Sequence, residues 1–388
     1  MSFAQQEGMD AKNLVRSWGL ATAGLLMATA ASAANVTIAW DASVEPNVAG
    51  YRVEYGTAPG VYTVAVDVGA QTSAVIQNLN NGTAYYFVVR AYTPSRQLGA
   101  PSTEISTRVG VRPIVAGDFS SDYRSDTAVF RPQTGTWHVR NIATGQITEV
   151  QWGWNGDKPV AGDYDGDGSV DVAVFRPSNG IWYIRNSSNG AMTTIQWGWS
   201  NDVPVPGDYD GDGRIDVAVF RPGNGVWYIR NSSNGSTTAM QWGWSTDTPM
   251  PGDFDGDGRT DISVFRSSTA TFYMRTSLTG ATVAYQWGWA GDVPMVGDFD
   301  GDSKDDIAVF RPTTAFWYVR NSSTGALSST QWGWAGDRPV PADYDGDGRV
   351  DVTVFRPSTG AWYIRSSVTG GMSSIQWGWP TDTPIGVR

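Results

Sequence analysis

The chain of 388 residues contains no cysteine and only one histidine, His138. The missing cysteines exclude thiol catalysis, zinc–thiolate sites, iron–sulfur clusters and a disulfide framework. A single histidine excludes a cluster of histidine metal ligands and argues against a Ser-His-Asp triad. Apart from the acidic loops described below, no pair of carboxylates and no nucleophile suggests a catalytic site. We therefore expect a protein that is not an enzyme, with a polysaccharide lyase or hydrolase as the less favoured alternative.

Positive charge is also scarce. Lysine and arginine total 27 against 38 aspartate and glutamate residues, which gives a net charge of −11. This balance argues against nucleic acid or an anionic membrane surface as a partner, because both are recognised by basic patches. It makes acidic ligands poor candidates and cations good ones.

Residues 1–33 have the pattern of an export signal. Lys12 and Arg16 precede an apolar run over residues 20–31, and Ala31-Ser32-Ala33 supplies a small-residue cleavage pattern. The run is shorter than the ~20 residues that span a bilayer. No other segment could cross a membrane, so we expect no membrane insertion. The sequence predicts a secreted, extracellular protein, either shed or held at a cell surface.

Glycine and aromatic residues are abundant: 46 Gly, 19 Trp and 16 Tyr, a composition typical of short strands joined by tight turns. We predict an all-β protein that begins with a small β-sandwich over residues 35–110, where apolar and polar residues alternate. Trp40 and the run over residues 79–87, with Tyr85 as a tyrosine corner, resemble a fibronectin type III module. The resemblance implies that Trp40 and Tyr85 are core residues and that the module is a spacer or a weak binding unit.

Residues 111–388 contain six copies of one unit. Gln-Trp-Gly-Trp recurs every 45 residues, and an aspartate opens a second motif with the same spacing. Each copy contains four short strands; in the second they are expected near residues 159–162, 171–176, 181–186 and 192–198. A four-stranded repeat of this length is the blade of a β-propeller, so we predict six blades, with a solenoid as the alternative. The two motifs begin at Gln151, Gln196, Gln241, Gln286, Gln331 and Gln376, and at Asp118, Asp163, Asp208, Asp253, Asp298 and Asp343.

The C-terminal tail resembles the segment that begins each repeat. Residues 381–388 repeat the blade-opening segment 156–163, although residues 112–118 already supply such a segment. The tail either takes part in closing the propeller or is offered to another subunit. Self-association through the tail is therefore an open alternative.

An acidic loop is the strongest chemical signal. Residues 163–171 place carboxylates at loop positions 1, 3, 5 and 9, a glycine at position 6 and a carbonyl ligand at position 7. Oxygen ligands without His or Cys favour Ca²⁺, and five copies predict about five ions. The alternative is a turn with aspartate caps and no ion. The predicted ligands are Asp163, Asp165, Asp167, Ser169 and Asp171; Asp208, Asp210, Asp212, Arg214 and Asp216; Asp253, Asp255, Asp257, Arg259 and Asp261; Asp298, Asp300, Asp302, Lys304 and Asp306; and Asp343, Asp345, Asp347, Arg349 and Asp351.

Two copies of the loop depart from the pattern. Ser303 replaces the position-6 glycine of the fifth copy, which predicts a strained or weaker site. The first copy keeps Asp118, Asp122 and Asp126 but has Ser120 and Tyr123 at positions 3 and 6, so we do not expect it to hold an ion. Because the loops lie on different blades, we expect them to act independently.

The segment over residues 162–168, followed by 171–175, resembles the FG-GAP and VCBS repeats of integrin-like propellers. The resemblance implies structural calcium in the loops and ligand recognition elsewhere on the propeller. Integrin propellers have seven blades, whereas this chain has six repeats.

The tryptophans and arginines of the repeats have two interpretations. The two Trp of each Gln-Trp-Gly-Trp motif either pack between sheets or recognise ligand, since exposed Trp faces stack on sugar rings. For the arginines that follow a phenylalanine in each copy, we expect stacking on Trp or pairing with loop aspartates. The ligand-binding candidates are Trp154, Trp199, Trp244, Trp289, Trp334 and Trp379, and the arginines are Arg131, Arg176, Arg221, Arg266, Arg311 and Arg356.

Together these features predict a secreted, calcium-binding propeller that serves binding, adhesion or extracellular assembly, with an extracellular protein or a glycan as ligand. The alternative is a lectin that uses Trp-lined sites between blades. Binding to immobilised glycans distinguishes the two.

Overall fold

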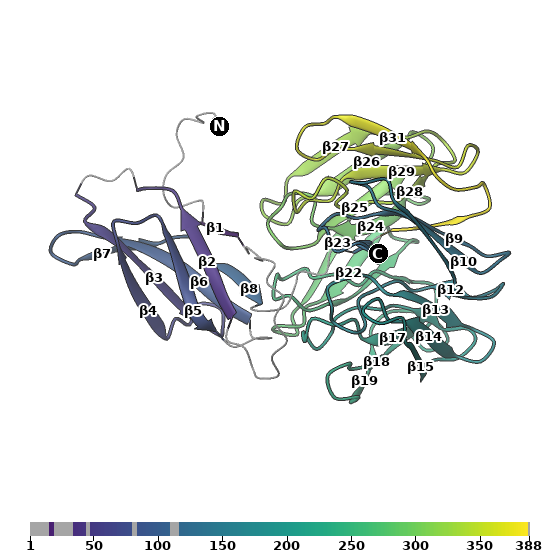
Figure 1. The fold of residues 1–388 in the computed structure, drawn as a ribbon, viewed down its shortest axis with the longest axis horizontal. Helices are drawn as coiled ribbons and strands as arrows, with labels where there is room; N and C mark the ends of the chain where they lie inside the picture. Colours follow the sequence, from purple (N-terminus) through teal and green to yellow (C-terminus); the bar gives the residue numbers. More distant parts are fainter. Residues whose placement is uncertain (1–14, 19–33, 44–46, 80–83, 109–115, 387–388) are drawn as a thin grey trace. The chain divides into compact units, whose positions relative to one another are not determined.

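The computed structural model describes residues 15–18, 34–43, 47–79, 84–108 and 116–386. The chain separates into two compact units, Met1–Val111 and Arg112–Arg388. Both units are built from strands, and the described residues contain no helix, so none is present that could span a membrane (Figure 1). The all-β prediction is confirmed. Most of the predicted export signal lies outside the described residues.

The first unit contains two sheets. One has the order β1-β2-β5, and the other has the order β4-β3-β6-β7 with β8 also paired to β6. The only described part of the predicted export signal, Val15–Trp18, is strand β1 and pairs with β2. The strands are β1 (Val15–Trp18), β2 (Ala34–Trp40), β3 (Gly50–Gly56), β4 (Val64–Gly69), β5 (Ser73–Leu79), β6 (Ala84–Tyr92), β7 (Leu98–Pro101) and β8 (Ile105–Arg108).

The core of this unit lies between its two sheets. Trp40 and Tyr85 are both 8% exposed, and they share one cluster with Val53 and Phe87. The Trp40 ring contacts Tyr51 edge to face at 5.6 Å, an arrangement that aromatic pairs prefer. Trp40 and Tyr85 are therefore core residues, as predicted.

The second unit contains six four-stranded sheets within residues 127–385. Five of them run in sequence order. In the second copy, for which bounds were predicted, the strands agree with the prediction to within about two residues, except that the first strand already ends at Pro159. The strands are β9 (Thr127–Arg131), β10 (Thr136–Arg140), β11 (Ile147–Gln151); β12 (Lys158–Pro159), β13 (Val172–Arg176), β14 (Ile181–Arg185), β15 (Met192–Gln196); β16 (Val203–Pro204), β17 (Val217–Arg221), β18 (Val226–Arg230), β19 (Thr237–Gln241); β20 (Thr248–Pro249), β21 (Ile262–Arg266), β22 (Thr271–Arg275), β23 (Thr282–Gln286); β24 (Val293–Gly297), β25 (Asp306–Arg311), β26 (Phe316–Arg320), β27 (Leu327–Gln331); and β28 (Arg338–Pro339), β29 (Val352–Arg356), β30 (Ala361–Arg365), β31 (Met372–Gln376), β32 (Thr383–Ile385).

Each sheet is buried against its neighbours. Strand β13 is buried along its whole length, because its alternate side chains face the sheets on either side. The cluster around Phe175 and Trp182 also contains Val217 and Val219, which belong to the next sheet. The first Trp of each Gln-Trp-Gly-Trp motif joins neighbouring sheets in the same way, as the Trp152 indole donates to the Tyr183 carbonyl at 3.0 Å.

The C-terminal tail completes the sheet that begins the repeats. Strand β32 pairs with β9, in the sheet order β11-β10-β9-β32, so the two ends of the repeat array are joined by hydrogen bonds. Asp382, directly before β32, forms a bidentate ion pair with Arg131 at 2.9 Å. The tail is therefore engaged within its own chain, and this corrects the alternative in which it is offered to another subunit.

The connections between strands lie at two opposite ends of each sheet. In the second sheet, the acidic loop 163–171 and the β14–β15 turn share one end, where the Ser187 hydroxyl donates to Asp167 at 2.9 Å. The β13–β14 turn and the Gln-Trp-Gly-Trp connection share the other, where the Trp197 amide donates to the Gly180 carbonyl at 2.9 Å. We call these ends the acidic face and the tryptophan face.

Candidate functional site

The acidic loop is shaped by its first aspartate and its glycines. In the second copy, the Asp163 carboxylate accepts hydrogen bonds from the amides of Gly166 at 2.6 Å and Gly168 at 2.8 Å. Both glycines have left-handed backbones, with φ of 81° and 85°. Side chains other than glycine rarely adopt this conformation, so the spacing of the two glycines sets the turn.

The later aspartates are anchored to the neighbouring turn. Asp171 accepts from the amides of Ser187 at 2.6 Å and Tyr164 at 2.9 Å. The Ser188 hydroxyl donates to Asp165 at 2.5 Å. These bonds hold the carboxylates on one side of the loop, where they face one another.

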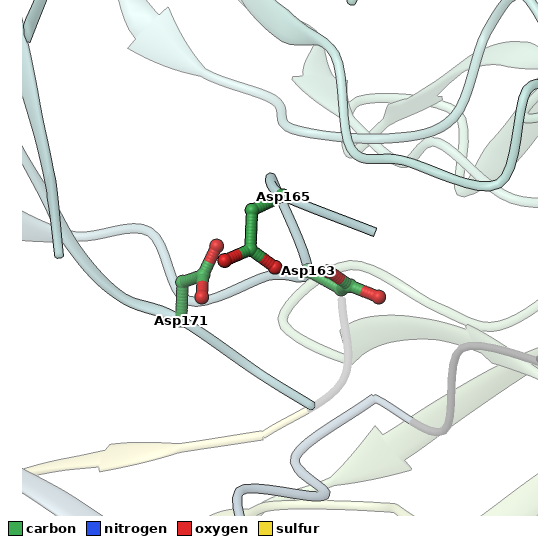
Figure 2. Close-up of side chains that lie close together, drawn as sticks. All are labelled: Asp163, Asp165 and Asp171. Atoms are coloured by element: carbon green, nitrogen blue, oxygen red, sulfur yellow. The ribbon is translucent and has the colours of Figure 1, made fainter. Parts of the chain in front are cut away.

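Three carboxylates converge in each of the five complete copies, with one oxygen from each within 4.8 Å of the others. Figure 2 shows the side chains of Asp163, Asp165 and Asp171 lying close together. The structure thus brings together three of the four predicted carboxylates in each copy. The clusters are Asp163, Asp165 and Asp171; Asp208, Asp210 and Asp216; Asp253, Asp255 and Asp261; Asp298, Asp300 and Asp302; and Asp343, Asp345 and Asp347.

Buried oxygen atoms without partners lie in three of these clusters. The Oδ1 atoms of Asp255, Asp300 and Asp345 are inaccessible to solvent and have no hydrogen-bond partner. Buried carboxylate oxygens are normally paired, because an unsatisfied one carries the full cost of desolvation. A cation bound among the carboxylates would satisfy them, and a set of oxygen donors alone suits a hard ion such as Ca²⁺.

The same clusters have perturbed acidity. Burial, followed by repulsion from neighbouring carboxylates, raises the pKa of Asp208 to about 7 and that of Asp253 to about 8, against the opposing hydrogen bonds from loop amides. Burial also raises the pKa of Asp261 and Asp298 to about 6. The ionised form of these carboxylates is therefore costly in the folded protein, and a bound cation would lower that cost.

The first copy of the loop satisfies its carboxylates differently. Asp118 accepts the amide of Tyr123 at 2.8 Å, and the Asn141 side chain donates to Asp122 at 2.9 Å. Asp126 accepts the Ile142 amide at 3.1 Å. No three carboxylates converge in this described loop.

Ser303 has the left-handed backbone that glycine has in the other complete copies, with φ of 68°. Its amide still donates to Asp298 at 2.8 Å, as the amide of Gly168 donates to Asp163. The predicted strain is therefore present in the backbone, while the turn keeps its form.

The side chains at loop position 7 reach the neighbouring loop, which sequence reasoning missed. Arg214 lies so close to Gly166 of the preceding loop that a Cβ added there would be 2.9 Å from its Nε atom. Lys304, Arg349 and Arg124 lie in the same way over Gly256, Gly301 and Gly346. At one of the two other loop positions, Ser169 hydrogen-bonds Ser121 of the less acidic first loop. The basic residue that recurs at loop position 7 is the sequence signal from which this contact between loops could have been predicted.

Backbone hydrogen bonds also join consecutive loops. The Ile215 amide donates to the carbonyl of Asp163 at 2.7 Å, and the Ser125 amide closes the series by donating to Asp343 at 2.6 Å. Neighbouring loops are thus in direct contact, although they belong to different sheets, and their independence stays a prediction.

The tryptophan face carries a repeated stack of side chains. The second Trp of the motif is exposed, 67% in the case of Trp154, and one side of its ring lies 3.7 Å from the Arg176 guanidinium. The same guanidinium also lies 4.4 Å from the Tyr183 ring, and the buried Asp157 binds it at 2.8 Å through both carboxylate oxygens. Asp157 also accepts the Trp154 amide at 2.8 Å. The stack fixes the Trp ring and leaves one of its faces free.

Six copies of the Trp–Arg–Asp arrangement are present. The arginines stack on Trp as predicted, but they pair with the aspartate that precedes each first strand and not with an aspartate of the acidic loops. These aspartates were missed, although their 45-residue spacing marks them. The copies are Trp379, Arg131 and Asp382; Trp154, Arg176 and Asp157; Trp199, Arg221 and Asp202; Trp244, Arg266 and Asp247; Trp289, Arg311 and Asp292; and Trp334, Arg356 and Asp337.

One of these stacks borders a pocket of about 290 Å³. Gln241, Trp242, Trp244, Arg266 and Tyr273 line it, together with Gly243 and Val264. Its wall combines aromatic rings with a guanidinium and an amide, a mixture typical of small-molecule sites.

Family comparisons match both units. A model of the FG-GAP-like repeat matches residues 163–219, 208–264 and 298–354, and a model of the fibronectin type III domain matches residues 23–108. The chain therefore carries an N-terminal fibronectin type III domain followed by FG-GAP-like repeats. No curated protein sequence matches the chain.

Solved structures give similarities of fold. TolB from Acinetobacter baumannii is similar with a TM-score of 0.50 and 15% identity, covering 78% of this chain and 80% of that one. A structure of an Agrocybe aegerita lectin that recognises non-reducing terminal N-acetylglucosamine has a TM-score of 0.45 and 18% identity, covering 65% of this chain and 76% of that one. The similarity to TolB agrees with a β-propeller-like fold.

Proposed function

We propose that this chain is a secreted, calcium-stabilised β-propeller that binds an extracellular partner. Its FG-GAP-like repeats, which follow a fibronectin type III domain in the sequence, form the propeller. In this proposal the acidic face holds about five structural Ca²⁺ ions and the tryptophan face recognises the ligand. The fibronectin-like domain serves as a spacer, and no catalytic group is required.

The buried, unpartnered Oδ1 atoms of Asp255, Asp300 and Asp345 are the observation that carries the calcium part. Loop amides and serine hydroxyls satisfy many of the other carboxylate oxygens, so aspartate capping accounts for much of the loop. It does not account for these three atoms, which lie in the carboxylate clusters where a cation would be coordinated. Extracellular modules bind Ca²⁺ with dissociation constants of ~0.1 to 1 mM, which matches a secreted protein.

Counting bound ions tests this part. Wild-type protein dialysed against millimolar calcium should retain about five ions per chain by elemental analysis. Asp255→Ala should remove about one, whereas Asp122→Ala, in the first loop, should remove none. Wild-type protein that retains no calcium would refute the proposal.

A glycan is the second candidate ligand. The ring of Trp244 is 62% exposed, its orientation is fixed by Arg266, and it borders the pocket on the tryptophan face. A rigid aromatic face beside hydrogen-bonding groups is suited to stacking on the apolar side of a sugar ring.

A screen against immobilised glycans tests this candidate. A glycan that binds the wild type should bind Trp244→Ala more weakly, with the melting temperature almost unchanged because the ring is exposed. Gln146→Ala, an exposed turn substitution on the acidic face, is the control. Absence of binding at millimolar sugar would exclude a lectin and leave a protein partner.

A further inference from the structure

A second pocket lies on the acidic face, between the sheet of β12–β15 and the sheet of β16–β19. Its volume is about 130 Å³. The first sheet contributes apolar Ile184 and Ile195 and polar Asn186 and Thr193; the next contributes two arginines, Arg214 and Arg230, beside Ser232. The pocket is separate from the tryptophan stacks, which lie at the opposite ends of these sheets.

The two arginines of this pocket have no ion pair in the described structure. Arg221, on the tryptophan face of the same sheet, is by contrast paired with Asp202 at 2.8 Å. Residues at the position of Arg230 in later sheets also have partners: Arg320 lies 4.0 Å from the Tyr285 ring, and Arg365 donates to Thr330 at 3.1 Å. Arg214 and Arg230 therefore have donors to offer a ligand.

We propose that this pocket binds a carboxylate, either of a small organic acid or of an acidic sugar. Guanidinium groups recognise carboxylates through charge-assisted, often bidentate hydrogen bonds. Asn186, Thr193 and Ser232 provide further polar groups, while the isoleucines limit competition by water. The volume accommodates a carboxylate with a short attached group.

Opposing charges set the strength of this interaction. Arg214 lies against the acidic loop that contains Asp165 and Asp167, and the whole chain carries a net charge of −11. Repulsion from these carboxylates slows and weakens the approach of an anion, so binding should be in the millimolar range. The pocket is a local exception to the rule that acidic ligands suit this chain poorly.

The preceding sheet interface provides a matched control. There, Ser169 takes the place of Arg214, and Arg185 takes the place of Arg230, so only one of the two guanidiniums is present. Arg230→Gln and Arg214→Ser each remove one charge from the proposed pocket, and the second reproduces the natural serine. Arg185→Gln removes the same charge from the neighbouring interface.

The experiment is a titration of the full chain, at constant calcium, with sodium acetate, sodium glucuronate and glucose, followed by NMR chemical shifts. Both anions, or glucuronate alone, should bind, and glucose should not. Equal affinities for acetate and glucuronate would identify a small organic acid as the ligand. Tighter binding of glucuronate would identify an acidic sugar. Arg230→Gln and Arg214→Ser should each weaken binding roughly tenfold, while Arg185→Gln should leave it unchanged.

Two results would overturn the proposal. One is that glucuronate shifts no more NMR resonances than glucose does. The other is an equal loss of binding in Arg185→Gln and Arg230→Gln. Arg230→Lys, which keeps the charge, should retain part of the binding, and melting curves of every variant separate loss of the site from loss of the fold.

Discussion

At the scale of single residues, the bidentate Arg–Asp pairs of the tryptophan face are the most sensitive positions. The Asp202 side chain is 1% exposed and that of Arg221 is 14% exposed. Arg221→Ala would leave the aspartate buried without its partner, so it should lower the free energy of unfolding by roughly 3 to 5 kcal/mol. Chemical denaturation measures this change.

An exposed arginine is the control for that substitution. Arg259→Ala removes the same charge from the acidic face and should change stability by less than about 1 kcal/mol. Equal effects of the two substitutions would show that the buried pair has no special role.

Ser303 gives a second prediction at this scale. Because its φ of 68° is unfavourable for a residue with a Cβ, Ser303→Gly should raise the free energy of unfolding by about 1 kcal/mol. The reverse change at the equivalent position, Gly213→Ser, should lower it by a similar amount. A loss of stability in Ser303→Gly would contradict the strain.

At the scale of elements, strand β32 should hold the array of sheets together. Deleting residues 381–388 removes the pairing with β9 and leaves Arg131 without Asp382. We expect a clearly lower melting temperature for the second unit and an unchanged one for the first, measured by calorimetry. An unchanged transition for the second unit would mean that the tail does not stabilise the closure.

The strands and acidic loops could be predicted because their signals are local. The continuous apolar run over residues 172–175 and the Asp/Gly spacing in 163–171 are each contained within one short segment. Partners from distant segments could not be predicted in this way. For Arg176 the sequence predicts stacking on Trp or pairing with a loop aspartate, and its acidic partner is instead Asp157, because sequence distance does not separate the two aspartates. The contact of Arg214 with the preceding loop depends on how neighbouring sheets pack.

The end of the chain illustrates the same limit. The sequence showed that residues 381–388 repeat a first strand, but it left closure and self-association equally open. Only the pairing of β32 with β9 decides between them, and that contact joins residues about 250 positions apart.

At the scale of the whole molecule, the acidic loops link stability to pH. The pKa of Asp208 is raised to about 7 and that of Asp253 to about 8, above the value of about 3.9 in an unfolded chain. At pH values between the unfolded and the folded pKa of each aspartate, the folded, ion-free state therefore binds more protons than the unfolded state. The stability of that state falls as the pH rises toward 8.

In chelator, the melting temperature should therefore be higher at about pH 5.5 than at about pH 8. Calcium competes with protons for the same carboxylates, so its stabilising effect should be larger at the higher pH. Thermal melts at the two pH values, with calcium and with chelator, measure both effects. A calcium effect that is the same at both pH values would contradict this linkage.

Calorimetry of the full chain with calcium and with chelator tests the central claim most directly. Five sites with dissociation constants of ~0.1 to 1 mM, at ~2 mM free ion, would contribute roughly 3 to 9 kcal/mol in total. The account predicts that chelation lowers the melting transition of the FG-GAP-like unit substantially and leaves that of the fibronectin-like unit, which has no such loop, in place. An FG-GAP-like unit that melts at the same temperature in both conditions would contradict a stabilising role for calcium.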